Sequence, residues 1–120
     1  MGETFEKLEV WRRAHALSVE IYHLLAVCRD WGFKDQITRS ANSISDNIAE
    51  GAERRGKAEF KQFLGYAKGS AGEARSQVLR ALALGYLDRD TGSRITRELR
   101  EISRMIHGLI DALERSEALD

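Results

Sequence analysis

Apolar residues recur at steps of three and four along most of the chain, which is the period of an α-helix with one buried face. The fourth stretch is the most regular, because its isoleucines and leucines follow near-heptad spacing. Short polar turns separate the stretches, so neighbouring helices are expected to be antiparallel. The pattern predicts an all-α fold, an antiparallel up-and-down four-helix bundle, with helices from about Phe5 to Arg29, Lys34 to Arg54, Lys57 to Leu84, and the turn at 88–92 to Arg115.

Glycines supply the expected helix ends and one expected packing site. We expect a left-handed Gly32 to end the first helix and Gly85 to end the third. The middle of the third helix is rich in small residues, including Gly69 and Gly72. Each interior glycine costs about 1 kcal/mol relative to alanine, so the sequence predicts that another backbone approaches closely there.

Length and composition favour one compact domain over residues 1–120. Hydrophobic residues make up 42% of the 120 residues and charged residues 32%, and proline is absent. The single Cys28 has no partner for an intramolecular disulfide, which is typical of a reducing compartment. The sequence shows neither a signal-peptide core nor an apolar stretch of ~20 residues. We therefore expect a soluble, cytoplasmic protein without membrane contact.

Residue types that carry chemistry do not assemble into a recognisable motif. Glu20 and His23 have the Glu-x-x-His spacing of di-iron bundles, but such sites need a second copy. The other candidate, His107, has Arg104 three positions earlier, and a cation there opposes metal binding. We expect no catalytic residue, no metal and no cofactor, hence no enzyme; a metal-dependent enzyme is the weaker alternative.

Positive charge is concentrated in one segment, although the net charge is zero. From Arg54 to Arg80 there are seven cations and two anions. Clustered cations can contact nucleic-acid phosphates, whereas a solvated basic surface is the plain alternative, since no stacking aromatics interleave with them. The predicted nucleic-acid-binding residues are Arg54, Arg55, Lys57, Lys61 and Lys68.

The second helix carries a polar stripe beside its isoleucines. The stripe consists of Gln36, Ser40, Ser43, Asn47 and Glu50, which step by four, three, four and three. Short polar side chains suit a helix surface poorly, so we expect a hydrogen-bonded network inside the bundle or between subunits. A simple exposed face is the alternative.

The run Gln36–Gly51, with its core Ser-Ile-x-x-Asn-Ile-Ala-Glu-Gly, closely resembles the signature of a bacterial family. These are the four-helix bundle proteins encoded in intervening sequences of 23S ribosomal RNA genes. Residues 8–14, 59–70 and 84–87 resemble the same family, so the likeness covers nearly the whole chain. It implies the four-helix fold and a structural motif of Gln36, Ser43, Asn47, Glu50 and Gly51, of which Asn47, Glu50 and Gly51 organise the end of the second helix.

The family is also similar to the accessory proteins of diversity-generating retroelements, which form pentameric barrels and engage nucleic acid through basic surfaces. The resemblance implies a non-catalytic homo-oligomer, a pentamer, that acts as a scaffold or as an accessory factor associated with RNA or DNA. Those relatives are strongly basic, whereas this chain is neutral. A purely protein-binding or structural module is the competing hypothesis.

Overall fold

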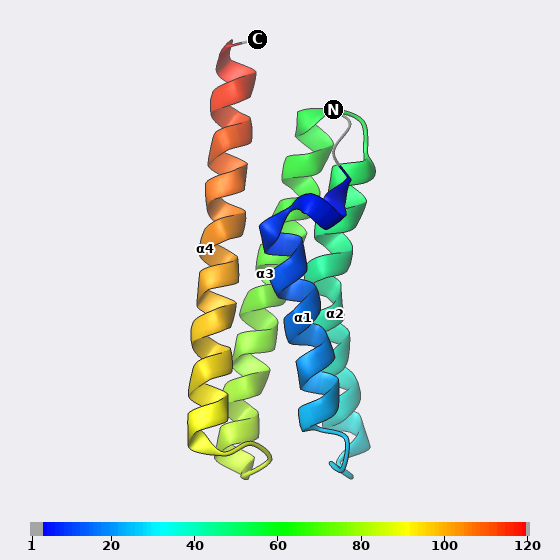
Figure 1. The fold of residues 1–120 in the computed structure, drawn as a ribbon, viewed down its shortest axis with the longest axis vertical. Coiled ribbons are helices and arrows are strands. Elements are labelled where there is room, and N and C mark those ends of the chain that lie inside the picture. Colours follow the sequence, from blue (N-terminus) through cyan, green and yellow to red (C-terminus); the bar gives the residue numbers. More distant parts are fainter. Residues whose placement is uncertain (1–3, 120) are drawn as a thin grey trace.

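The computed structural model describes residues 4–119, and they form an antiparallel bundle of four α-helices (Figure 1). The molecule measures 50 × 20 × 19 Å along its principal axes. The predicted all-α four-helix fold is confirmed. The single-domain prediction also covers residues 1–3 and 120, which lie outside the described part. The elements are a 3₁₀ turn at Phe5–Lys7, α1 at Glu9–Leu24, α2 at Trp31–Glu53, α3 at Gly56–Leu84 and α4 at Arg89–Leu119.

The start of α2 lies three residues earlier than expected, and the prediction for Gly32 was wrong. The Asp30 side chain accepts a 3.2 Å hydrogen bond from the Phe33 N–H and caps the first turn. Gly32 lies inside this turn and does not have a positive φ. The first predicted helix is also shorter and interrupted, because Leu8 is extended and α1 ends at Leu24.

The second half of the chain follows the prediction more closely. Gly85 adopts φ 78° and ends α3, as expected. In the predicted turn, Asp88 accepts a 2.8 Å hydrogen bond from the Thr91 N–H, and α4 begins already at Arg89. Gly92 is therefore helical, and it is buried against Leu82.

All four helices contribute to one hydrophobic core. Its largest side chains are fully buried, and removing each from water stabilises the fold by roughly 1.5–3 kcal/mol before entropy is counted. The isoleucine and leucine stripes read from the sequence supply nearly all of them: Ile21, Leu25, Ile37, Ile44, Ile48, Leu64, Val78, Ile95, Leu99, Ile102 and Ile106.

The small residues of α3 divide between two faces. Ala67, Ala71 and Ala74 are buried and let the neighbouring helices come close. Gly69 and Gly72 instead face outward, and an added Cβ would meet nothing within 4 Å among the described residues. The predicted close approach at these glycines was wrong: within the chain, alanines make the close packing.

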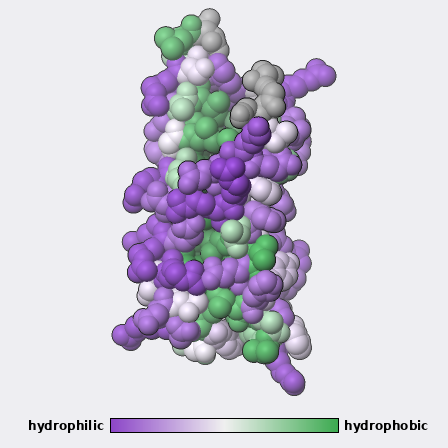
Figure 2. Space-filling view, in the orientation of Figure 1, coloured by the Kyte–Doolittle hydropathy of each residue, from purple (hydrophilic) through white to green (hydrophobic). Residues whose placement is uncertain are grey.

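The helices differ in length, and this shapes the surface. At 16 residues α1 is about half as long as α4, which has 31. The C-terminal end of α4 projects beyond the other helices (Figure 1). The visible face is mostly hydrophilic and carries separate apolar patches in its upper, middle and lower parts (Figure 2). Among residues 4–119, none of the helices combines the length and hydropathy needed to span a bilayer.

Candidate nucleic-acid interface

Two residues in the middle of the polar stripe of α2, Ser40 and Ser43, form hydrogen bonds with α3. Ser40 is buried and donates a 2.5 Å hydrogen bond to the buried Gln77 of α3. Ser70 of α3 donates a 2.9 Å hydrogen bond to Ser43, which also accepts one of 2.9 Å from Asn47. The network lies inside one chain. Gln36, at the start of the stripe, is exposed at the edge of the same seam.

The end of α2 packs tightly against the start of α3. A Cβ on Gly51 would lie 2.7 Å from the Cβ of Phe63 and 3.3 Å from the carbonyl oxygen of Phe60. Only glycine fits this approach without a shift of the α3 backbone. Glu50, one residue earlier, points outward and pairs with Arg54 at 2.9 Å, and Arg54 also covers the ring of Phe63.

Four of the five predicted nucleic-acid-binding residues, all except Arg55, contact other side chains of the described part of the chain. Arg54 pairs with Glu50 and, at 3.3 Å, with Glu59. The Lys57 ammonium donates a 2.5 Å hydrogen bond to the hydroxyl of Ser116 on α4. Arg55 is exposed and forms no ion pair within residues 4–119.

Lys61 pairs with Glu117, and this contact raises the pKa of Lys61. Because Glu117 lies on the last turns of α4, acidic residues of α4 offset the positive charge at this end of α3. The fifth predicted residue, Lys68, lies further along α3. The part of α4 beside it carries Arg100 and Arg104.

The antiparallel register of α3 and α4 brings cations together beyond Lys68. The Lys68 ammonium lies 3.2 Å from Nδ1 of His107. Seven residues further along α3 and seven back along α4, the same register places Arg75 beside Arg100, since residues seven apart lie on one helix face. The two helices enclose a groove of about 340 Å³, the α3–α4 groove, lined by Lys68, Ala71, Gly72, Arg75, Leu99, Arg100, Ser103, Arg104 and His107.

The α3–α4 groove is electropositive, because none of the described residues that line it is a carboxylate. Arg75 and Arg100 form no ion pair with any residue from 4 to 119, whereas Arg104 pairs with Glu101 at 3.1 Å outside the groove. Four permanent cations line this groove together with small residues such as Ala71 and Gly72, and such an arrangement can attract phosphate oxygens.

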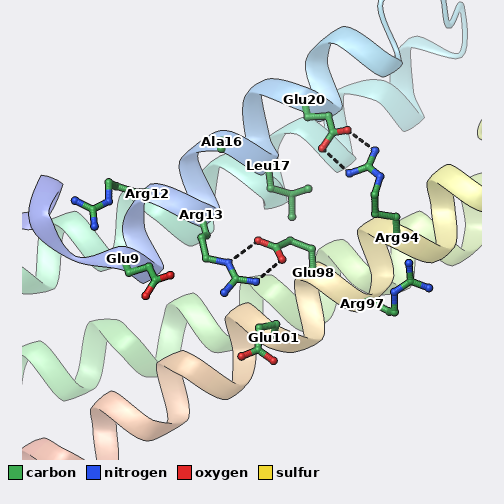
Figure 3. Close-up of a pocket in the computed structure, with 10 residues that line it drawn as sticks. All are labelled: Glu9, Arg12, Arg13, Ala16, Leu17, Glu20, Arg94, Arg97, Glu98 and Glu101. Atoms are coloured by element: carbon green, nitrogen blue, oxygen red, sulfur yellow. Dashed lines mark hydrogen bonds and ion pairs between the residues drawn. The ribbon is translucent and has the colours of Figure 1, made fainter.

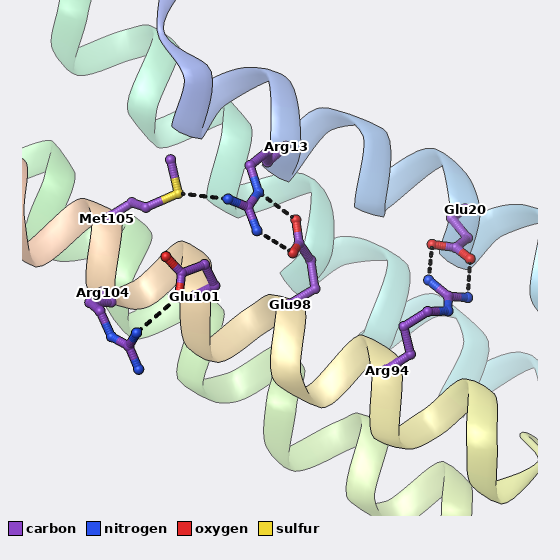
Figure 4. A network of polar contacts seen from close by, with 7 residues as sticks. All are labelled: Arg13, Glu20, Arg94, Glu98, Glu101, Arg104 and Met105. Atoms are coloured by element: carbon purple, nitrogen blue, oxygen red, sulfur yellow. Dashed lines mark hydrogen bonds and ion pairs between the residues drawn. The ribbon is translucent and has the colours of Figure 1, made fainter.

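A second groove, between α1 and α4, is larger but charge-balanced (Figure 3). It has a volume of about 780 Å³ and is lined by four arginines and four glutamates. The Arg13 guanidinium donates hydrogen bonds of 2.5 and 2.9 Å to the Glu98 carboxylate, and two nitrogens of Arg94 donate hydrogen bonds to the Glu20 carboxylate (Figure 4). These bonds raise the pKa of both arginines. Equal numbers of opposite charges give this groove little attraction for a polyanion.

Of the two residues with metal-like spacing on α1, Glu20 and His23, only Glu20 has an ion-pair partner within the described chain, and this partner explains its place. Glu20 is occupied by Arg94, and His23 is exposed. Within residues 4–119, no three His, Cys, Asp or Glu side chains are grouped so that they could hold a metal ion.

The sequence prediction omitted Arg75, Arg100 and Arg104 from the site. A signal was present, because Arg100, Arg104 and His107 are spaced four and three apart beside the isoleucine stripe of α4. Which α3 residues they meet depends on the register of the two helices, and that follows only from the three-dimensional packing.

Together these features define a four-helix bundle with one basic groove beside its longest helix. The chain belongs to the 23S rRNA-intervening sequence protein family, whose family model matches residues 6–108. The resemblance read from Gln36–Gly51 is therefore confirmed, whereas the link to retroelement accessory proteins stays a prediction.

A solved structure supports the same assignment. It is a protein of unknown function from the S23 ribosomal protein family of Bacteroides thetaiotaomicron VPI-5482. The two chains share 25% sequence identity and superpose with a TM-score of 0.79, over 84% of this chain and 97% of that one. Among curated proteins, none matches this chain.

Proposed function

We propose that this chain is a non-catalytic, self-associating bundle that binds RNA by contacting the phosphates of the RNA backbone. The observation that carries the proposal is the α3–α4 groove, where Lys68, Arg75, Arg100 and Arg104 converge without a carboxylate among the described residues that line it. A groove that contacts phosphates recognises backbone shape and charge, not base sequence. Membership of a family named for 23S rRNA intervening sequences makes RNA the first ligand to test.

The expected affinity follows from counterion release. If four cations each neutralise one phosphate of an RNA duplex, log K falls with log salt with a slope of about −3.6. Binding is then weak at physiological salt and strong at low salt. A DNA duplex of the same length tests whether the RNA geometry matters.

A charge-reversal pair and a matched control isolate the groove. The variant Arg75→Glu/Arg100→Glu changes the net charge by four in the α3–α4 groove. The control Arg12→Glu/Arg97→Glu makes the same change in the charge-balanced α1–α4 groove. We expect the first variant to lose affinity for a labelled RNA stem-loop at least tenfold more than the control, measured by fluorescence anisotropy at low salt. Equal losses would contradict the groove as the site, and absence of binding by the natural protein would favour a protein-binding module.

Self-association is the second part of the proposal, and the resemblance implies a homopentamer. Native mass spectrometry and light scattering give the number of subunits directly. A monomer at micromolar concentration would overturn this part and leave the RNA groove to be tested separately.

A further inference from the structure

His107 lies at the edge of the α3–α4 groove between a cation and an anion. Its Nδ1 atom is 3.2 Å from the ammonium of Lys68 on α3, and its Nε2 atom is 3.4 Å from Oδ2 of Asp111 on α4. An ammonium can only donate a hydrogen bond, so Nδ1 accepts from Lys68 and carries no proton. The proton of the neutral ring is then on Nε2, directed at Asp111.

Protonation of the ring changes both contacts. A proton on Nδ1 removes the acceptor of Lys68 and places two positive charges side by side, so the flexible lysine must turn away. The imidazolium keeps its contact with Asp111, which becomes an ion pair. The other charged groups around the ring are Arg104 on α4 and, further along the groove, Arg75 and Arg100. These cations lie along the path by which an anion would approach the ring.

A bound phosphate can interact with all of these groups. Its negative charge offsets the surrounding cations and accepts hydrogen bonds from the imidazolium Nδ1–H and from the released Lys68 ammonium. Histidine is the side chain whose charge ordinarily changes between about pH 5 and 8. We propose that His107 is a proton-dependent phosphate-binding residue of the α3–α4 groove, so that this site binds a phosphodiester backbone more tightly as the pH falls. The inference rests on the proposed RNA binding and adds its regulation.

Thermodynamic linkage gives the proposal a second consequence. If a proton promotes phosphate binding, phosphate binding must promote uptake of a proton by the same coupling. Calorimetric titration of an RNA stem-loop into the protein near neutral pH, in buffers of different ionisation enthalpy, measures this uptake. We expect up to one proton per groove, and none in His107→Gln, which keeps a polar side chain but does not titrate.

The test compares binding of the stem-loop at pH 5.5 and pH 8.0 across a salt series. For the natural protein we expect at least threefold tighter binding at pH 5.5, with a salt slope steeper by about one. His107→Gln should bind equally at both pH values, and His107→Arg should bind tightly at both because its charge is permanent. His23→Gln, which removes an exposed histidine of α1 outside the groove, should behave like the natural protein.

The outcomes separate the two proposals. If the natural protein binds RNA with the same affinity and salt slope at both pH values, or if His107→Gln keeps the pH dependence, the role of His107 is overturned and the proposed function stands. If RNA is not bound at either pH, the proposed function fails as well. The ring proton is testable without RNA: two-dimensional ¹⁵N NMR should show the Nε2–H tautomer of His107 at pH 8, and the opposite tautomer would contradict the contact with Lys68.

Discussion

The hydroxyl of Tyr86 donates a 2.7 Å hydrogen bond to the carboxylate of Asp30, joining the loop before α2 to the loop before α4. The other oxygen of Asp30 accepts from the Phe33 N–H, and the rings of Phe33 and Tyr86 pack edge to face at 5.3 Å. One carboxylate thus caps a helix and ties together two connections that are 56 residues apart in sequence.

These contacts predict a specific loss of stability in acid. The hydrogen bond from Tyr86, followed by that from the Phe33 backbone, lowers the pKa of Asp30. Because the folded pKa lies below the unfolded one, the ionised carboxylate stabilises the fold above the unfolded pKa, and this contribution is lost as the pH falls through the folded pKa, below about 4. In urea unfolding, the stability difference between the natural protein and Tyr86→Phe should therefore shrink from about pH 6 to pH 3. A difference that is constant with pH would show that the hydroxyl does not act through Asp30.

Gly51 should tolerate no side chain. Alanine there would place its Cβ 2.7 Å from the Cβ of Phe63, so α2 and α3 would have to separate, at a cost of about 1–3 kcal/mol. The matched control is Gly108→Ala on α4, where nothing lies within 4 Å among the described residues and alanine should stabilise the helix by about 1 kcal/mol. Thermal and denaturant unfolding of both variants measures the contrast, and a neutral Gly51→Ala would contradict the close approach.

The buried pair Ser40 and Gln77 should behave as a unit. Ser40→Ala leaves the side-chain oxygen of Gln77 without its donor and should cost about 1–3 kcal/mol. Replacing both residues, in Ser40→Ala/Gln77→Leu, removes the unpaired polar group and should recover most of that loss. A double-mutant cycle on unfolding free energies gives the coupling directly. Additive effects would mean that the two side chains do not depend on each other.

The ion pairs between α1 and α4 should make α1 the salt-sensitive helix. Glu98→Gln breaks the bidentate contact with Arg13 and should lower stability by about 1 kcal/mol at low salt and by less in 1 M salt. Hydrogen exchange should quicken in α1 before it quickens in α2 or α3. Arg39→Gln, which breaks an exposed pair within α2, is the control expected to change little.

The fold was largely predictable because the apolar period of each helix is regular. The wrong predictions concern residue types that occur in more than one structural role, such as Asp and Gly. Asp30 and Gly32 resemble a helix end, but the Asp30 side chain begins a helix, and only the bond to Phe33 distinguishes these readings. The outward-facing Gly69 and Gly72 resemble packing residues for a similar reason, since composition does not show which face they occupy.

The basic site is only partly predictable because the order of charges along the sequence does not show which of them are neighbours in the fold. Electrostatic attraction depends on neighbours in space, and α4 contributes both the acids that offset Lys61 and the arginines that reinforce Lys68. The seven cations from Arg54 to Arg80 are therefore not one surface. Their division follows from the order of acidic and basic residues along α4.

The projecting end of α4 sets how far the basic surface extends. Ser116 and Glu117 hold Lys57 and Lys61, and both lie within the last turn of α4, where helices fray most readily. Unwinding that turn withdraws a hydroxyl and a carboxylate from the two lysines. Loss of the Glu117 carboxylate from Lys61 then extends the unneutralised positive charge on α3 from Lys68 to Lys61, about two turns nearer its N-terminus, so the stability of a terminal helical turn controls the size of an electrostatic surface.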